Sequence, residues 1–325
     1  MRGNSFGKLL SMTSFGESHG KGLGVIIDGV PSGLDFNLED LKAQLKKRAP
    51  GQLPGTTSRK EQDNPIIYSG IYEGKTLGTP IMVLVENTNQ RSDDYKKLKN
   101  EFRPGHADET TLLKYGIRDH RGGGRSSGRE TLARVIGGYF ASLILPETKI
   151  NSWITQLGPF EMKTVNPSAN AYHLAEAERE KEIESFLLGL KEKGDSVGGR
   201  VETIIENCPV GLGEPVFDKL KADMAKAILS IGACVGFGIG LGEDMANQAG
   251  SIVSQNRESF GGIEGGISNG RDIKMTSTFK PTSTVGEKAK EGRHDPCILP
   301  RVIPVVNSMA MFVLADHYLR QKAYQ

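Results

Sequence analysis

Arginine, histidine and glycine gather in one stretch of this sequence, residues 103–131. It holds five arginines and two histidines, and three consecutive glycines occupy positions 122–124. Ser127 and Glu130 then form the S-x-x-E signature of a helix start, and apolar residues follow at helical spacing. Guanidinium groups and the unpaired N–H groups of a helix start both attract anions. The stretch therefore predicts a binding site for an anionic ligand. A solvated basic loop before a capped helix is the alternative.

His19 is a second candidate for chemistry. It lies in the glycine-rich turn 13–24, where Glu17 and Ser18 precede it and Gly20 follows. A side chain in such a turn makes few packing contacts, and imidazole changes its charge near neutral pH. We therefore expect a general acid or an anion contact at this position. A turn histidine that only bonds the backbone is the alternative.

The spacing of apolar residues predicts the helices and strands that position these groups. Alternating or continuous apolar runs indicate strands, and apolar residues three and four apart indicate helices. Strands are expected near 6–12, 24–28, 66–72, 80–86, 150–157, 199–207, 234–241 and 272–279, and helices near 37–47, 131–146, 173–193, 215–231 and 307–324. His173 would then lie on a helix surface, and His317 on a helix surface or interface.

A short internal repeat bears on the domain organisation. Residues 26–34 read IIDGVPSGL, and residues 204–212 read IIENCPVGL. Both follow an expected strand and precede an expected helix. A recurring strand, turn and helix indicates duplication. We therefore expect a single domain, 1–325, of two similar halves, roughly 1–150 and 151–325.

Composition narrows the class of protein. The net charge of +2 is close to balance, and aromatic residues make up only 6% of the chain, which disfavours a nucleic-acid surface. No apolar signal region and no run near 18 apolar residues occurs, so neither export nor a membrane span is expected. Sparse cysteines suit a reducing compartment, and we expect a cytoplasmic protein.

Several common sites are not supported by the sequence. It contains no strand–GxGxxG–helix unit with a following acid, no P-loop and no H-E-x-x-H. The three cysteines, Cys208, Cys234 and Cys297, have no metal-ligand spacing. No metal site is therefore expected.

Six motifs, taken together, make the chain resemble the chorismate synthase family. They are GESHG (16–20), RPGHAD (103–108), GGGRSSGRET (122–131), EGG (264–266), KPTST (280–284) and GRHDP (292–296), in the family's order. The resemblance implies an α+β fold, a β–α–β sandwich of two similar halves, and a homotetramer. It implies a lyase that converts 5-enolpyruvylshikimate 3-phosphate to chorismate and phosphate by anti-1,4-elimination with reduced FMN. This is the last common step of aromatic amino acid biosynthesis, and NADPH is a possible external reductant.

The resemblance also implies roles for particular residues. His19 matches the acid at the leaving phosphate, His106 a histidine beside the flavin, and Asp295 the carboxylate that works with flavin N5 in proton removal. Arg48 and Arg129 match substrate or NADP contacts. The FMN contacts match Arg125, Ser126, Ser127, Gly232, Ala233, Gly265, Lys280, Pro281, Thr282, Ser283, Thr284 and Arg293.

Three departures from the family pattern qualify these roles. Gly232 stands where members more often have asparagine, and Pro54 where many have an arginine linked to pyridine-nucleotide binding. The segments before EGG and between KPTST and GRHDP are also shorter than usual. A catalytically idle anion- or flavin-binding protein on this scaffold is one alternative function, and RNA binding by the basic half is another.

Overall fold

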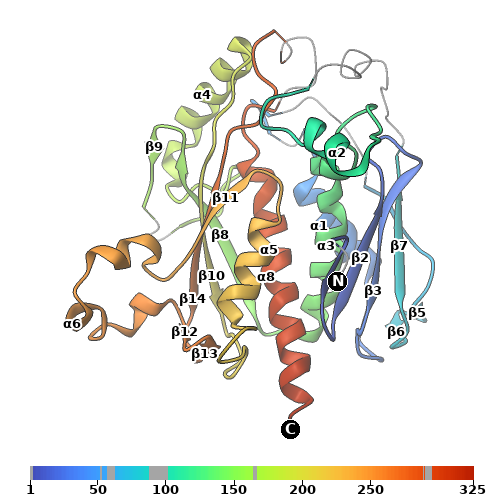
Figure 1. Ribbon diagram of the computed structural model, residues 1–325, viewed down its shortest axis with the longest axis vertical. Helices are drawn as coiled ribbons and strands as arrows, with labels where there is room; N and C mark the ends of the chain where they lie inside the picture. The colour runs from blue at the N-terminus through green and yellow to red at the C-terminus, as the bar shows by residue number, and fades with distance from the viewer. Residues whose placement is uncertain are drawn as a thin grey trace.

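Two five-stranded antiparallel sheets face each other across a layer of helices (Figure 1). The computed structural model describes residues 3–51, 53–56, 63–87, 102–163, 167–287, 289 and 295–325. The strand order is β1-β2-β3-β7-β4 in the first sheet and β11-β14-β10-β8-β9 in the second. This arrangement confirms the predicted α+β, β–α–β sandwich.

The first sheet comprises β1 (Ser5–Gly7), β2 (Ser11–Gly16), β3 (Gly22–Asp28), β4 (Pro65–Ile67) and β7 (Ile81–Glu86). The second comprises β8 (Lys149–Leu157), β9 (Phe160–Glu161), β10 (Gly199–Glu206), β11 (Cys234–Ile239) and β14 (Ile273–Phe279). Between the sheets lie α1 (Leu38–Arg48), α3 (Thr131–Ile144), α5 (Leu220–Leu229) and α8 (Leu299–Lys322). Buried side chains alternate along β7 and β14 because one face of each sheet packs on this helical layer.

Smaller elements surround this framework. They are the helices α2 (Asp108–Tyr115), α4 (Glu180–Lys193) and α6 (Gly250–Val253), the hairpin strands β5 (Ile71–Tyr72), β6 (Lys75–Thr76), β12 (Ile263–Glu264) and β13 (Ile267–Ser268), and the 3₁₀ turns Gly124–Ser126, Gly128–Glu130, Ala177–Arg179, Gly242–Asn247 and Arg257–Phe260. The helix predicted from residue 173 therefore begins only at Glu180. His173 lies in a loop with a left-handed backbone, at φ 58°, rather than on a helix surface.

Helix α8 is the centre of the hydrophobic core. It packs against α1, α3 and α5 and reaches strands of both sheets. Its length and apolar composition would suffice to cross a membrane, but 78% of its most apolar window is buried inside the fold. That burial is typical of the core helix of a globular protein.

A buried carboxylate on α8 holds the turn between β1 and β2. Asp316 Oδ1 accepts hydrogen bonds from the backbone N–H groups of Lys8, Leu9 and Leu10, at 3.2, 2.8 and 2.9 Å. The neighbouring His317 is 2% exposed, and its Nε2 lies 2.9 Å from Asp223 Oδ2 on α5. His317 thus lies in a helix–helix interface, one of the two positions expected for it.

The two copies of the internal repeat form the same turn. Strands β3 and β10 occupy the middle of their sheets. Gly29 and Asn207, which correspond in the repeat, both have positive φ, 87° and 56°, and so do Gly33 and Gly211, 83° and 90°. Each copy is also held by one buried hydroxyl from a short hairpin.

Thr76 and Ser268 supply these two hydroxyls. Thr76 Oγ1 donates to Pro31 O at 2.7 Å and accepts from Leu34 N at 2.9 Å. Ser268 Oγ donates to Pro209 O at 2.6 Å and accepts from Leu212 N at 2.9 Å. Both residues are 2% exposed. The two halves therefore share a hydrogen-bonded clip as well as a sequence pattern.

We expect Thr76→Val and Ser268→Ala each to lower the free energy of unfolding by about 1–3 kcal/mol, because each removes the hydroxyl that pairs with an N–H and a carbonyl in a part-buried turn. Urea unfolding followed by circular dichroism measures the change. Ser251→Ala, at an exposed position on α6, serves as the control and should change stability by less than about 0.5 kcal/mol. Wild-type stability of either clip variant would contradict this assignment.

Candidate active site

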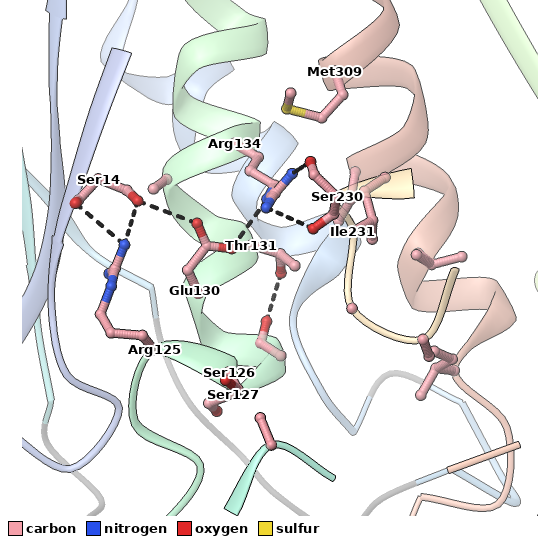
Figure 2. A pocket seen from close by; sticks show the side chains of 18 of the residues that line it. Ser14, Arg125, Ser126, Ser127, Glu130, Thr131, Arg134, Ser230, Ile231 and Met309 are labelled. Atoms are coloured by element: carbon pink, nitrogen blue, oxygen red, sulfur yellow. Dashed lines mark hydrogen bonds and ion pairs between the residues drawn. The ribbon is translucent and has the colours of Figure 1, made fainter. Parts of the chain in front are cut away.

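A cavity of about 840 Å³ lies where α3, α5 and α8 meet β1 and β2. Four segments distant in sequence line it, at 105–107, 125–134, 230–233 and 280–283. Figure 2 shows the part of its wall between α3 and α8. Nine of the predicted site residues line the cavity: His106, Arg125, Ser126, Ser127, Gly232, Ala233, Lys280, Thr282 and Ser283.

The cavity combines an apolar side with many charges. Its apolar side chains include Phe6, Met12, Val302, Val305 and Met309. Among the described residues, its cationic side chains are those of Arg125, Arg134, Lys226, Lys280 and Arg301, and its one lining carboxylate is that of Glu130. The excess of positive charge favours an anionic ligand, and the apolar side favours one with a flat or hydrocarbon part.

The glycine turn places Arg125 against strand β2. Its Nη1 donates to Gly16 O at 3.1 Å, and its Nη2 donates to Ser14 O and Ser14 Oγ at 3.2 and 2.5 Å (Figure 2). Ser127 Oγ accepts from Arg129 N at 3.3 Å and so caps the short turn before α3, as the sequence predicts. The capped turn thus lies at the cavity while β2 anchors Arg125.

Glu130 does not complete the predicted capping box. Its carboxylate instead bonds Arg134 Nε at 3.0 Å and accepts from Ser14 Oγ at 3.3 Å (Figure 2). Arg134 also contacts the second half of the chain. Its Nη1 donates to Ser230 Oγ at 2.7 Å, and its Nη2 donates to Ser230 O at 3.0 Å. Sequence analysis named Glu130 only for the capping box and did not select Arg134 or Ser230, although Glu130 and Arg134 have the i,i+4 spacing of a helical ion pair.

His106 is held at the cavity by a buried carboxylate. Its Nδ1 lies 3.0 Å from Asp108 Oδ1, which also receives Arg103 and Arg118. Burial alone would raise the pKa of Asp108, but the hydrogen bonds and charge of Arg103 bring that pKa to about 2. Burial lowers the pKa of His106, and Arg103 lowers it further against the opposing effect of Asp108. His106 therefore contacts the cavity mainly as a neutral imidazole near pH 7.

The segment 280–284 is tied to the loop before α2 and to Ala233. Lys280 Nζ donates to Gly105 O at 3.1 Å and to Ser283 Oγ at 2.9 Å. Lys280 N donates to Ala233 O at 2.9 Å. Open space surrounds the Cα of Gly232, so nothing in the described fold requires a small residue there. These bonds join three of the predicted ligand-binding segments into one wall.

Asp295 lies directly behind this wall. Its backbone oxygen accepts from Thr282 Oγ1 at 3.0 Å, and its Oδ2 receives Arg301 Nη1 at 2.5 Å. Thr282 and Arg301 both line the cavity. Arg293, an expected FMN contact two residues before Asp295, lies outside the described residues. Sequence analysis missed Arg301, because it stands six residues further on, inside α8.

His19 lies beside the glycine turn but does not line the cavity. It is 9% exposed, and its Nδ1 is 3.0 Å from Ser18 Oγ. A Cβ on Gly122 would come within 2.2 Å of that Nδ1. Gly122 also has φ 129°, so glycine is required there both by the backbone and by the imidazole. The structure thus brings GESHG and GGGRSSGRET together.

Arg48 and Arg129 share one buried carboxylate below the turn. Arg48 Nη2 lies 3.0 Å from one oxygen of Asp63, and Arg129 Nη1 lies 2.9 Å from the other. The side chains of Arg48 and Asp63 are 1% exposed, and that of Arg129 is 6% exposed. Arg129 Nε also donates to Asn87 Oδ1 at 2.6 Å. Neither arginine lines the cavity.

The remaining expected ligand contacts lie apart from the cavity wall. Gly265 is exposed in the turn between β12 and β13, and its carbonyl accepts from Lys219 Nζ at 3.3 Å. Figure 1 shows β12 and β13 at the lower end of the second sheet, whereas α2 lies at the upper right. Pro281 and Thr284 flank lining residues without lining the cavity themselves.

Comparison with known proteins agrees with the motifs. The family model of chorismate synthase matches residues 10–319. The chorismate synthase of Christiangramia forsetii is 43% identical, covering 99% of both chains, and that of Flavobacterium psychrophilum is 44% identical, covering 100% of this chain and 99% of the relative. The first alignment spans 351 positions, so this chain of 325 residues lacks some residues that the relative has.

A solved structure described as a crystal structure of chorismate synthase has the same fold. Its TM-score is 0.77 at 29% identity, with 97% of this chain and 93% of that chain covered. The sandwich, the convergence of three of the motifs on one cavity and the full-length matches agree: this chain belongs to the chorismate synthase family.

Proposed function

We propose that this chain converts 5-enolpyruvylshikimate 3-phosphate to chorismate and phosphate in the cavity beside α3, with reduced FMN bound there. One observation carries the proposal. Three of the family motifs, RPGHAD, GGGRSSGRET and KPTST, are far apart in sequence and meet with Gly232 and Ala233 at one cation-rich cavity with an apolar side. The substrate carries a phosphate and two carboxylates, and guanidinium and ammonium groups are the usual partners of such anions.

The residues around the cavity fit FMN. Its volume of about 840 Å³ is within the roughly 300–1,000 Å³ of small-molecule sites. The apolar side of Met12, Val302 and Met309 suits a flat ring system, and Lys280 with the hydroxyls of Thr282 and Ser283 suits a phosphate. Reduced FMN supplies transient electron density for the elimination, which has no net redox change.

The chain's own residues would bind and move protons. We assign His19 to protonating the leaving phosphate, because it borders the glycine turn at Gly122. His106, largely neutral, would hydrogen-bond the cofactor from the cavity wall. Asp295, behind Thr282 and Arg301, would hold the proton that leaves the ring carbon.

The role of Arg48 and Arg129 is the least direct. Both were assigned to substrate or NADP binding, and NADPH remains a proposed external reductant. Their shared contact with Asp63 favours support of the capped turn over direct ligand contact, because buried arginines bound to a carboxylate have fewer N–H groups left for a ligand.

The remaining assignments rest on the family resemblance. We propose a cytoplasmic homotetramer, one domain, 1–325, with halves at roughly 1–150 and 151–325. The clips at Thr76 and Ser268 support the two-halves assignment. Size-exclusion chromatography with light scattering measures the mass of the oligomer. A mass other than four times 35.2 kDa would contradict the homotetramer.

Anaerobic turnover tests the proposed reaction. Protein, reduced FMN and substrate should release phosphate and chorismate in equal amounts, and the flavin spectrum should change on substrate addition. A flavin-binding protein without catalysis would change the spectrum and release no phosphate. An RNA-binding protein would do neither, and would instead bind RNA with a strong salt dependence.

We expect Arg125→Ala to weaken FMN binding at least about tenfold while the protein stays folded. Without its bonds to Ser14 and Gly16, the capped turn loses its anchor on β2, and charge-assisted hydrogen bonds are the stronger class. Calorimetric titration with FMN measures this. Arg121→Ala is the matched control, since Arg121 is exposed in the same turn and pairs with Asp119. Equal FMN affinity in both variants would exclude Arg125 from the site.

A further inference from the structure

Arg301 is the cavity residue in closest contact with the assigned proton acceptor. It lies in the first turn of α8 and lines the cavity. Its Nη1 donates to Asp295 Oδ2 at 2.5 Å, and the two side chains are 24% and 12% exposed. A charge-assisted hydrogen bond this short and this sheltered from water is of the strong kind.

Both ends of this contact are held in place. Arg301 Nε donates to Arg48 O at 3.4 Å, which ties the guanidinium to the end of α1. Thr282 Oγ1 donates to the backbone oxygen of Asp295 at 3.0 Å, which ties that residue to the cavity wall. The carboxylate therefore has little freedom to rotate.

The two carboxylate oxygens of Asp295 are not equivalent. Oδ2 is occupied by Arg301, whereas Oδ1 is buried and has no hydrogen-bond partner within the described part of the chain. A buried carboxylate oxygen without a donor is energetically costly.

We propose that Arg301 is the positioning residue for Asp295 in the elimination. It binds Oδ2 and so fixes the direction of the carboxylate beside the cavity. When the ring C–H bond breaks, its proton passes to the Asp295 carboxylate and its electron pair forms a new ring double bond. The existing ring double bond shifts, and the C–O bond to phosphate breaks. This inference rests on the role proposed for Asp295.

A competing role for Arg301 is direct substrate binding. Its Nη2 makes no hydrogen bond within the described segments, so a carboxylate of the substrate would be an available acceptor. The two roles differ in outcome. A positioning residue acts only through Asp295, whereas a substrate-binding residue acts whether or not Asp295 is present. A double-mutant cycle separates them.

The test compares Arg301→Gln, Arg301→Lys, Asp295→Asn and the double variant Arg301→Gln/Asp295→Asn. Arg301→Gln should lower kcat by about 10–100-fold, the usual size of a misplacement effect, with KM changed less than about threefold. Arg301→Lys should recover part of the loss. In the Asp295→Asn background, Arg301→Gln should cost less than about twofold in single-turnover phosphate release.

A second measurement guards against a merely structural effect. The deuterium isotope effect at the abstracted position should rise in Arg301→Gln, because proton removal becomes more rate-limiting. Arg320→Gln is the matched control, since Arg320 lies on the same helix and binds Asp218 and Asp223 instead. It should leave kcat and the isotope effect unchanged even if it lowers the melting temperature.

Three results would overturn the proposal. These are additive losses in the double variant, an Arg301→Gln defect confined to KM, and an unchanged isotope effect. If Arg301→Gln does not fold, the same cycle with Arg301→Lys decides the question. Failure of the wild-type chain to make chorismate would instead refute the proposed function, so the two failures are distinguishable.

Discussion

Replacing Asp295 by asparagine is expected to lower turnover by about 10²–10⁴-fold, the usual contribution of a positioned acid or base. An amide has the shape of the carboxylate but cannot take up a proton. Affinity for FMN and substrate should change little, because the cationic side chains that line the cavity are unchanged. Raising the pH should not restore activity.

Rapid-quench single-turnover measurement of phosphate release, with protiated and deuterated substrate, provides the test. The isotope effect should increase in Asp295→Asn. Asp272→Asn, at an exposed position before β14, is the control and should behave as wild type. Wild-type turnover by Asp295→Asn, or loss of substrate binding without loss of kcat, would show that Asp295 is a structural turn residue.

Long periodic elements and local motifs could be read from the sequence. The core strands β3, β8, β10 and β14 and the helices α1 and α3 lie close to their predicted ranges. The repeat at 26–34 and 204–212 was detectable because the same turn needs a left-handed residue at two fixed positions, which Gly29 and Asn207, and Gly33 and Gly211, supply.

Element boundaries at prolines were harder to predict. Helix α8 begins at Leu299, eight residues before the predicted start at 307, since Pro300 occupies a helix start and Pro304 lies inside the helix. Proline has no N–H, which costs nothing in the first turn, where that group has no partner anyway. The sequence pattern alone treats both prolines as breakers.

Side-chain partners between distant segments could not be predicted. The motifs located Arg48, Arg129 and Asp295, but the partners of these residues, Asp63 and Arg301, carry no local signal. Such pairs depend on the packing of α1, α3 and α8 against each other. Sequence spacing therefore identifies which groups are present, and the fold decides which of them face a ligand.

Asp63→Asn is expected to lower the free energy of unfolding by about 3–5 kcal/mol, the usual cost of removing one partner from a buried ion pair. The carboxylate contacts two guanidinium groups at 3.0 and 2.9 Å, and all three side chains are almost completely buried. Its loss leaves two like charges close together in a medium that screens them poorly.

Urea unfolding of Asp63→Asn measures this cost. Asp35→Asn is the control, because Asp35 is 90% exposed and pairs with Lys75 at the surface, where an ion pair contributes less than about 1 kcal/mol. Asp63→Asn combined with Arg48→Met should lose less than the sum of the single changes, since the second change removes one of the unpaired charges.

Asp63→Asn also decides between two roles for Arg48 and Arg129, support of the turn before α3 and direct binding of substrate or NADPH. If both arginines mainly support the turn before α3, Asp63→Asn lowers the free energy of unfolding and weakens FMN binding through Ser127. The KM for substrate then rises as stability falls. If both bind substrate or NADPH directly, loss of Asp63 frees them for the anion. Stability then changes by less than about 1 kcal/mol, and the affinity for the anionic ligand rises. That second outcome would contradict the supporting role inferred from the buried contacts with Asp63.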